Sequence, residues 1–211
     1  MTMRIDSTMN SPFPTAEARQ AERNRKREAV LLAAVRLFNE RGFHAASLDD
    51  VAASLGVSKP TIYHYLGNKE QVLIECVTRG LEQLRAAADA GRAMAGTGRD
   101  RLVAFLRRYA QVNMDDFGRC VIRTDEESLS AQGAAQLRQR KREIDQAMRT
   151  MIEEAIADGS IPPCDVRLAA FVAAGALNWP GRWYDPAGPI PPEDMAEALV
   201  DLVVCGVAPG V

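Results

Sequence analysis

The sequence contains only two histidines and four scattered cysteines among its 211 residues. Both histidines, His44 and His64, lie in the N-terminal third. The cysteines form no CxxC pair, which argues against a zinc site or a redox motif and favours reduced thiols. Without histidine, the larger C-terminal part cannot perform Ser-His or Cys-His catalysis, and a histidine metal site is disfavoured there. We therefore predict no metal, no cofactor and no enzymatic activity.

The chain also lacks a long apolar run and a strong charge of either sign. No segment approaches the roughly 18 apolar residues that a membrane-spanning helix needs. Residues 1–14 are polar, contain proline and have no apolar signal core, so we expect a disordered leader and a cytoplasmic protein. The net charge of −2 means that any contact with DNA must come from a local basic patch.

Apolar residues recur at three- and four-residue spacing nearly throughout, and no run of alternating β-branched residues appears. This pattern predicts an all-α protein of about nine helices, long enough to bury a substantial core. The expected helices span residues 15–41, 47–56, 59–66, 69–93, 99–116, 128–158, 166–184 and 192–205. We divide the chain into a DNA-binding domain at residues 15–68 and a ligand-binding and dimerisation domain at residues 69–211.

A short glycine-containing turn joins the helices expected at residues 47–56 and 59–66. Ser47 fits an N-cap, because an acidic side chain follows three residues later. Pro60 is tolerated in the first turn of the next helix, where its missing N–H loses no internal bond. Two helices joined in this way form a helix-turn-helix, whose second helix enters the major groove of DNA. The sequence therefore predicts a DNA-binding unit centred on Ser47–Leu66.

The helix at residues 59–66 carries donors, acceptors and aromatic groups suited to DNA. No acidic residue occurs from Gly56 to Lys69, so nothing in that segment repels phosphate. We expect Tyr63 to face DNA and Tyr65 to be partly packed yet able to reach phosphate. A basic cluster at residues 23–27 could contact flanking phosphates, with a solvated helix face as the alternative. The predicted DNA-binding residues are Arg25, Ser47, Lys59, Pro60, Thr61, Tyr63, His64, Tyr65 and Lys69.

These N-terminal motifs together resemble the signature of TetR/AcrR-type regulators over about residues 25–77. The matching segments are Phe38 with Gly42-Phe43, Ser47–Ala52, Gly56–Ser58, Thr61–Tyr65 and Asn68–Glu70. Lys59-Pro60 and Leu66 depart from the residues common in that family. The resemblance implies an all-helical homodimer, usually a repressor, whose C-terminal domain binds a small ligand that releases a palindromic DNA operator.

The last two expected helices carry apolar stripes with small alanines that allow close helix approach. The stripes consist of Val166, Ala169, Ala170, Ala173, Ala174 and Leu177, then Met195, Leu199, Leu202 and Val203. One short reading helix covers too few base pairs for specificity, and a twofold pair matches a palindrome. We therefore predict a homodimer through Val166–Tyr184 and Pro192–Cys205, with an ordinary subunit core as the alternative.

Aromatic and polar residues in the C-terminal part are candidates for a ligand pocket. Both tryptophans lie in Leu177–Pro186, where Pro180-Gly181 favours a bend in the helix. The candidates are Phe105, Tyr109, Val112, Phe117, Arg119, Ile122, Arg123, Phe171, Asn178, Trp179, Arg182 and Trp183. Core packing is the alternative for the aromatic and aliphatic residues. For the arginines, the alternative is salt bridges to Asp115, Asp116, Asp125 or Glu126.

The Leu177–Pro186 segment and residues 188–193 also resemble a subgroup of these regulators that controls fatty-acid or steroid breakdown. The resemblance implies a hydrophobic effector such as an acyl-CoA thioester, although Pro180-Gly181 departs from the subgroup pattern. One alternative is a drug-sensing efflux regulator, in which the aromatic residues Trp179, Trp183 and Tyr184 would bind a cation together with Asp115, Asp116 and Asp125. A ligand-independent structural DNA-binding protein is the other. The helix at residues 69–93 links the two domains, and we expect it to transmit the effect of ligand binding to the DNA-binding domain.

Overall fold

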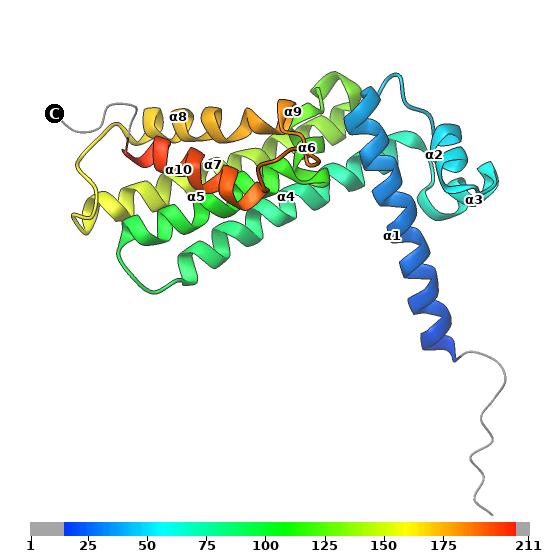
Figure 1. Cartoon of the computed structure of the whole chain (residues 1–211), viewed down its shortest axis with the longest axis horizontal. Helices are drawn as coiled ribbons and strands as arrows, with labels where there is room; N and C mark the ends of the chain where they lie inside the picture. Colours follow the sequence, from blue (N-terminus) through cyan, green and yellow to red (C-terminus); the bar gives the residue numbers. More distant parts are fainter. Residues whose placement is uncertain (1–14, 206–211) are drawn as a thin grey trace, which may run out of the picture.

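A computed structural model describes residues 15–205, which form ten α-helices, one 3₁₀ helix and no strand. The helices are α1 (Ala16–Arg41), α2 (Leu48–Leu55), α3 (Lys59–Leu66), α4 (Lys69–Ala93), α5 (Gly98–Met114), α6 (Asp116–Arg123), η1 (Glu126–Ser128), α7 (Ala131–Ala157), α8 (Val166–Asn178), α9 (Pro180–Trp183) and α10 (Pro192–Cys205). Figure 1 shows α1–α3 at one end and the remaining helices in an elongated bundle. The all-α prediction is confirmed, while the predicted leader at residues 1–14 lies outside the described residues.

The helix-turn-helix has the Ser47 cap that its sequence predicted. The Ser47 hydroxyl oxygen accepts a hydrogen bond from the Asp50 backbone N–H at 3.1 Å, and the Asp50 carboxylate accepts one from the Ser47 backbone N–H at 3.0 Å. Gly56 ends α2 in the left-handed conformation, with φ at 64°, which favours glycine because it has no Cβ. Buried Val51 and Ile62 then hold α2 and α3 together in one small core.

The segment after α5 differs from the sequence prediction, because α6 was not expected. Asp115 ends α5 and caps α6, since its carboxylate accepts a hydrogen bond from the Gly118 N–H at 2.8 Å. The two helices approach so closely that a Cβ at Gly118 would lie 1.8 Å from the Val112 carbonyl oxygen. Only glycine permits this junction, which places α6 between α1 and the bundle.

The interruption of the helix predicted at Pro180-Gly181 is present, between Asn178 and Pro180. α8 ends at Asn178, and the single-turn helix α9 follows, because Pro180 cannot donate an N–H to the hydrogen bonds of α8. Gly181 is buried there, and a Cβ on it would lie 2.8 Å from the Asn113 carbonyl oxygen. α9 therefore packs closely against α5 and α6.

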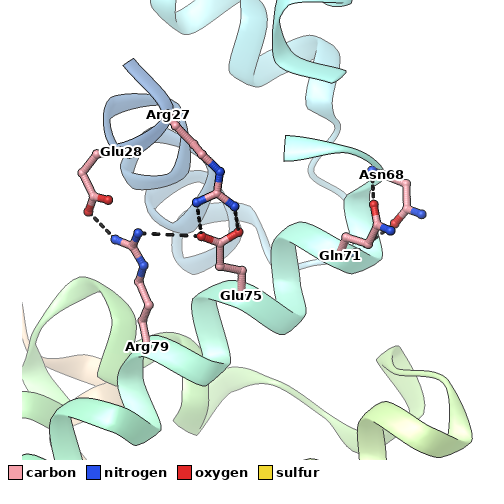
Figure 2. Close-up of polar contacts among 6 residues, drawn as sticks. All are labelled: Arg27, Glu28, Asn68, Gln71, Glu75 and Arg79. Atoms are coloured by element: carbon pink, nitrogen blue, oxygen red, sulfur yellow. Dashed lines mark hydrogen bonds and ion pairs between the residues drawn. The ribbon is translucent and has the colours of Figure 1, made fainter. Parts of the chain in front are cut away.

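The long helix α4 contacts both the DNA-binding unit and the bundle. Figure 2 shows Arg27 of α1 donating two hydrogen bonds to the Glu75 carboxylate of α4, at 2.6 and 2.5 Å. Arg79 of α4 pairs with Glu28 and lies 3.7 Å from Glu75. Because the four charges form a network, they fix the angle between α1 and α4 more firmly than an isolated surface pair would.

Within residues 15–205, no helix combines the length and the apolar character needed to cross a membrane.

Candidate DNA-binding surface and effector cavity

The reading helix α3 presents one face to the core and the other to solvent. Ile62 and Leu66 are buried, whereas Tyr63 is 45% exposed and His64 is also exposed. Tyr65 is half-buried against the core. The predicted difference between Tyr63 and Tyr65 is therefore confirmed. Their contacts with DNA, like those of exposed Pro60 and half-buried Thr61, remain predictions.

Lys59 has an acidic partner that its neighbours in sequence do not reveal. Its ammonium lies 2.8 Å from the Asp49 carboxylate of α2 and 5.9 Å from the centre of the Tyr63 ring. The hydrogen bond to Asp49 raises the pKa of Lys59. The segment from Gly56 to Lys69 contains no acidic residue, but the fold places one beside its first cation. A DNA phosphate that approached Lys59 would therefore compete with Asp49 for it.

Two other predicted DNA-binding residues make contacts within the subunit. The Ser47 hydroxyl belongs to the cap of α2. Lys69 donates a hydrogen bond to the His44 carbonyl at 3.3 Å, and its ammonium lies 4.4 Å from the centre of the Phe43 ring. Partial burial lowers the pKa of Lys69. Both residues hold the helix-turn-helix together, and their contacts with phosphate remain predictions.

The basic cluster at residues 23–27 is partly neutralised by nearby acids. Exposed Arg25 and Lys26 both pair with Glu22, at 2.6 and 3.3 Å. Arg27 binds Glu75 and belongs to the network between α1 and α4. Arg27 therefore positions α1. Arg25 is exposed, and its contact with phosphate remains a prediction.

A pocket of about 540 Å³, open to solvent on one side and hereafter called the central cavity, lies between α4 and the helices α5 to α9. It is lined by Leu81, Leu84, Tyr109, Val121, Ile122, Lys141, Arg142, Ile144, Asp145, Met148, Phe171, Ala174, Asn178 and Arg182. Most of the wall is aliphatic or aromatic, and the polar groups gather at two places. A cavity of this size and composition is suited to a small ligand with a large apolar part.

The first polar place lies between α5 and the end of α8. The Tyr109 hydroxyl donates a hydrogen bond to the Asn178 side-chain oxygen at 2.8 Å, and the Asn113 amide donates to the same oxygen at 2.9 Å. Burial raises the pKa of Tyr109 and keeps it protonated as a donor. The Asn178 amide nitrogen makes no hydrogen bond within residues 15–205, so it can donate to a ligand carbonyl in the cavity.

The second polar place is basic and consists of three residues, hereafter the rim cations: Lys141, Arg142 and Arg182. None of them forms an ion pair within the described part of the chain. The cavity's one acid, Asp145, lies 2.8 Å from Arg149 and is neutralised by it. Desolvation lowers the pKa of Lys141, opposed by nearby Glu126 and Asp125. The cavity thus favours a ligand that carries negative charge.

The structure brings Tyr109, Ile122, Phe171, Asn178 and Arg182 to the central cavity, as the sequence predicted. The α7 residues Lys141, Arg142 and Asp145 were missed, because on a polar helix they cannot be told from a solvated face.

Several other predicted ligand residues do not reach the central cavity. Phe105 and Val112 are fully buried core residues, and Phe117 packs beneath the Arg79 guanidinium at 5.4 Å. Trp179 and Trp183 are 63% and 48% exposed and lie outside the cavity. Trp179 follows the last residue of α8 and Trp183 ends α9. Because α8 is apolar on both faces, its periodicity does not identify which of them faces the core.

Arg119 and Arg123 are the other arginines predicted to bind a ligand. They do not line the central cavity, and they form no ion pair with the acids named as their alternative partners. Arg123 donates hydrogen bonds to three backbone carbonyls, and the Arg119 Nε is buried without a partner among the described residues. Asp116 pairs instead with Arg36, and Glu126 with Arg138. Within residues 15–205, the alternative of salt bridges from Arg119, Arg123 or Arg182 to these acids is therefore not found.

The predicted interface stripe of α8 faces the subunit's own core. Ala170, Ala173 and Leu177 are buried there, so the alternative of an ordinary core is right for these residues. The opposite side of α8 is also apolar, with Leu168 and Val172 more than half exposed. Large apolar residues exposed on α8–α10 are Leu168, Phe171, Val172, Trp179, Trp183 and Leu202. The same helices thus present a second apolar face to solvent.

Comparisons with known proteins agree with both parts of the fold. Residues 30–76 match the family of bacterial regulatory proteins called tetR, and residues 95–207 match the tetracyclin repressor-like C-terminal domain. The chain is 26% identical over 193 residues to the HTH-type transcriptional repressor KstR2 of Mycolicibacterium smegmatis, covering 86% of this chain and 90% of that protein.

Solved structures show the same likeness. The TetR-family regulator PfmR of Thermus thermophilus superposes with a TM-score of 0.76 and 29% identity, over 85% of this chain and 98% of that one. AibR, solved with isovaleryl coenzyme A and operator DNA, superposes with a TM-score of 0.73 over 88% of this chain and 100% of that one. At 23% identity the AibR likeness shows the fold alone. Because the C-terminal match by itself spans more than half of the sequence, this chain belongs to the TetR family of helix-turn-helix transcriptional regulators.

Proposed function

We propose that this protein is a repressor that binds a palindromic operator as a homodimer and releases it when a small effector fills the central cavity. The observation that carries the proposal is the placement of α4. This helix begins three residues after the reading helix ends, and its residues Leu81 and Leu84 line the cavity. An effector that favours one position of α4 would shift the angle between the DNA-binding unit and the bundle, because ligands act by differential affinity.

The chemistry of the cavity supports an anionic effector with an apolar body, such as an acyl-CoA thioester. The aliphatic wall suits an acyl chain, the Asn178 amide suits a thioester carbonyl, and the rim cations suit phosphates. AibR, which shares this fold, was solved with isovaleryl coenzyme A, and KstR2 is named a repressor. The ligand of AibR thus belongs to the class that the cavity residues favour, and the name of KstR2 supports the repressor role.

The alternative of a cationic drug finds less support in the cavity. Asp115, Asp116 and Asp125 do not line it, and Asp145 is already paired with Arg149. Both tryptophans lie outside it. A cation would therefore meet three like charges and no free carboxylate.

The rim cations provide a direct test of the ligand class. We expect Lys141→Gln and Arg142→Gln each to weaken binding of isovaleryl-CoA about tenfold, because a charge-assisted hydrogen bond contributes about 1.5 kcal/mol. Isothermal titration would measure the affinities. Arg140→Gln is the matched control, because it removes the same charge from the neighbouring position, where Arg140 lies 3.7 Å from Glu82 and does not line the cavity. Equal losses in all three variants, or operator release by ethidium and by no acyl-CoA, would contradict the proposal.

Lys59 and Asp49 test the DNA-binding surface, because their substitutions should act in opposite directions. We expect Lys59→Ala to weaken binding to a duplex selected from random DNA by about two- to tenfold and to lower the salt slope by about one. We expect Asp49→Asn to strengthen it about two- to fivefold, since this change frees Lys59 and removes a charge that repels phosphate. Fluorescence anisotropy over a salt series measures both. Weaker binding by Asp49→Asn would show that Lys59 does not contact phosphate.

A further inference from the structure

A single arginine joins the DNA-binding unit to the wall of the central cavity. Arg123, the last residue of α6, donates a hydrogen bond from Nη1 to the Asn39 carbonyl at 2.7 Å. Its Nε donates to the Gly181 carbonyl at 3.1 Å, and its Nη2 donates to the Arg182 carbonyl at 2.5 Å. One planar guanidinium therefore holds backbone from α1 and from α9 at the same time.

The carbonyls that Arg123 binds belong to helix ends. Asn39 lies in the last turn of α1, and Gly181 and Arg182 lie in the single turn of α9. Carbonyls at the end of a helix have no partner within the helix, and a cation is favourable there. From the end of α6, Arg123 thus binds free carbonyls of α1 and of α9. α1 belongs to the DNA-binding unit, and α9 belongs to the bundle.

On the cavity side, α9 is tied closely to the wall. Arg182 lines the central cavity and also a smaller cavity of about 180 Å³ between α1, α4, α6 and α9. Gly181 is packed against the Asn113 carbonyl, and the Asn113 amide in turn binds Asn178 and the Leu177 carbonyl at 2.9 and 3.3 Å. A shift of the cavity wall at the end of α8 therefore reaches Arg123 through direct contacts.

On the DNA side, α6 is fixed to α1 by further polar contacts. Arg36 lies 2.8 Å from the Asp116 carboxylate, and the Asn39 amide donates to the Asp116 carbonyl at 2.7 Å. Arg123 itself forms no ion pair within residues 15–205, and its neighbours Arg119 and Arg182 are cations. The position of Arg123 therefore depends on its hydrogen bonds to the three carbonyls. If one of these carbonyls moves, no paired carboxylate holds the guanidinium in place.

We propose that Arg123 is a positioning residue that transmits movement of α9 at the cavity wall to the last turn of α1, and so to the reading helix. It does not line the central cavity, so it acts through the three carbonyls and not by touching the effector. This inference rests on the proposed function in one respect: it assumes that the movement of α1 changes the affinity for DNA.

A double-mutant cycle tests the inference without an effector. Gly181→Ala places a Cβ 2.8 Å from the Asn113 carbonyl oxygen and 3.2 Å from Ile122 Cγ1, which displaces α9. Arg123→Gln removes the guanidinium that binds the α9 carbonyls and would move with them. We expect Gly181→Ala to weaken binding to the selected duplex about fivefold or more in the wild-type chain, but less than about twofold in the Arg123→Gln chain.

Arg85→Gln is the matched control for the lost charge, because Arg85 is exposed on α4. Its effect should add to that of Gly181→Ala without coupling. If Arg123→Gln fails to fold, as judged by thermal melting, Arg123→Lys serves instead, because an ammonium cannot bridge the three carbonyls. Additive effects of Gly181→Ala and the Arg123 variant, or no effect of Gly181→Ala on DNA binding, would overturn the inference.

A separate arm adds isovaleryl-CoA, palmitoyl-CoA or ethidium to the wild-type chain. A chain that keeps its operator in the presence of every acyl-CoA contradicts the proposed effector class. The double-mutant cycle without effector still tests the role of Arg123. Failure of the proposed effector class can therefore be distinguished from failure of the role proposed for Arg123.

Discussion

Val172→Glu should convert the protein to a monomer and weaken operator binding by more than about 100-fold, because burying an unpaired carboxylate costs about 3 kcal/mol or more. Val172 is 57% exposed on the outer apolar face of α8, close to Leu168. If that face packs against a second subunit, as we propose, the carboxylate would be buried against apolar side chains. A monomer carries one reading helix and loses the twofold match to a palindrome.

The two tryptophans offer a direct measurement of this change. They are the only tryptophans in the sequence, and both Trp179 and Trp183 are exposed on α8 and α9 in the single subunit. We expect the emission of the wild-type protein to shift to longer wavelength on dilution, and that of Val172→Glu to be shifted at every concentration. Light scattering after size exclusion gives the mass independently.

Ala135→Glu is the control for the added charge, because Ala135 is exposed on α7, away from this face. It should remain dimeric and bind DNA as the wild-type protein does. A dimeric Val172→Glu with unchanged emission and operator affinity would place the subunit interface elsewhere.

Gly118→Ala should lower the melting temperature by about 6–12 °C, which corresponds to about 3 kcal/mol in a chain of this size. The added Cβ would lie 1.8 Å from the Val112 carbonyl oxygen and 3.0 Å from the Asn113 Cα, and both are backbone atoms that cannot rotate away. α6 would have to leave α5, and the cap from Asp115 to Gly118 would be strained. Calorimetry of the full chain measures the change.

Gly133→Ala provides the matched control. A Cβ at Gly133 in α7 meets its nearest atom, the Ser130 hydroxyl oxygen, at 3.4 Å, which is an ordinary contact. Alanine has the better helix propensity, so we expect a melting temperature equal to or slightly above that of the wild-type protein. If Gly118→Ala melted like Gly133→Ala, the close junction of α5 and α6 would be wrong.

The sequence by itself determined the features that depend on neighbouring residues. The cap from Ser47 to Asp50, the end of α2 at Gly56 and the interruption before Pro180 all follow from local backbone chemistry, and each is present in the structure. The opposite exposures of Tyr63 and Tyr65 also follow, since a helix of two turns cannot bury both. These local signals sufficed to place the reading helix.

Only the tertiary structure decided which distant residues meet. The fold placed Asp49 beside Lys59, and it turned Lys141 and Arg142 of a polar helix toward the central cavity. It also directed Trp179 outward, because a helix that is apolar on both faces has no periodicity to identify its inner side. Burial and charge pairing depend on how the helices pack. The sequence of one helix does not show which side chains of a neighbouring helix will face it. For that reason the DNA-binding helix could be predicted from residues alone, whereas the basic rim of the cavity and the carbonyls held by Arg123 could not.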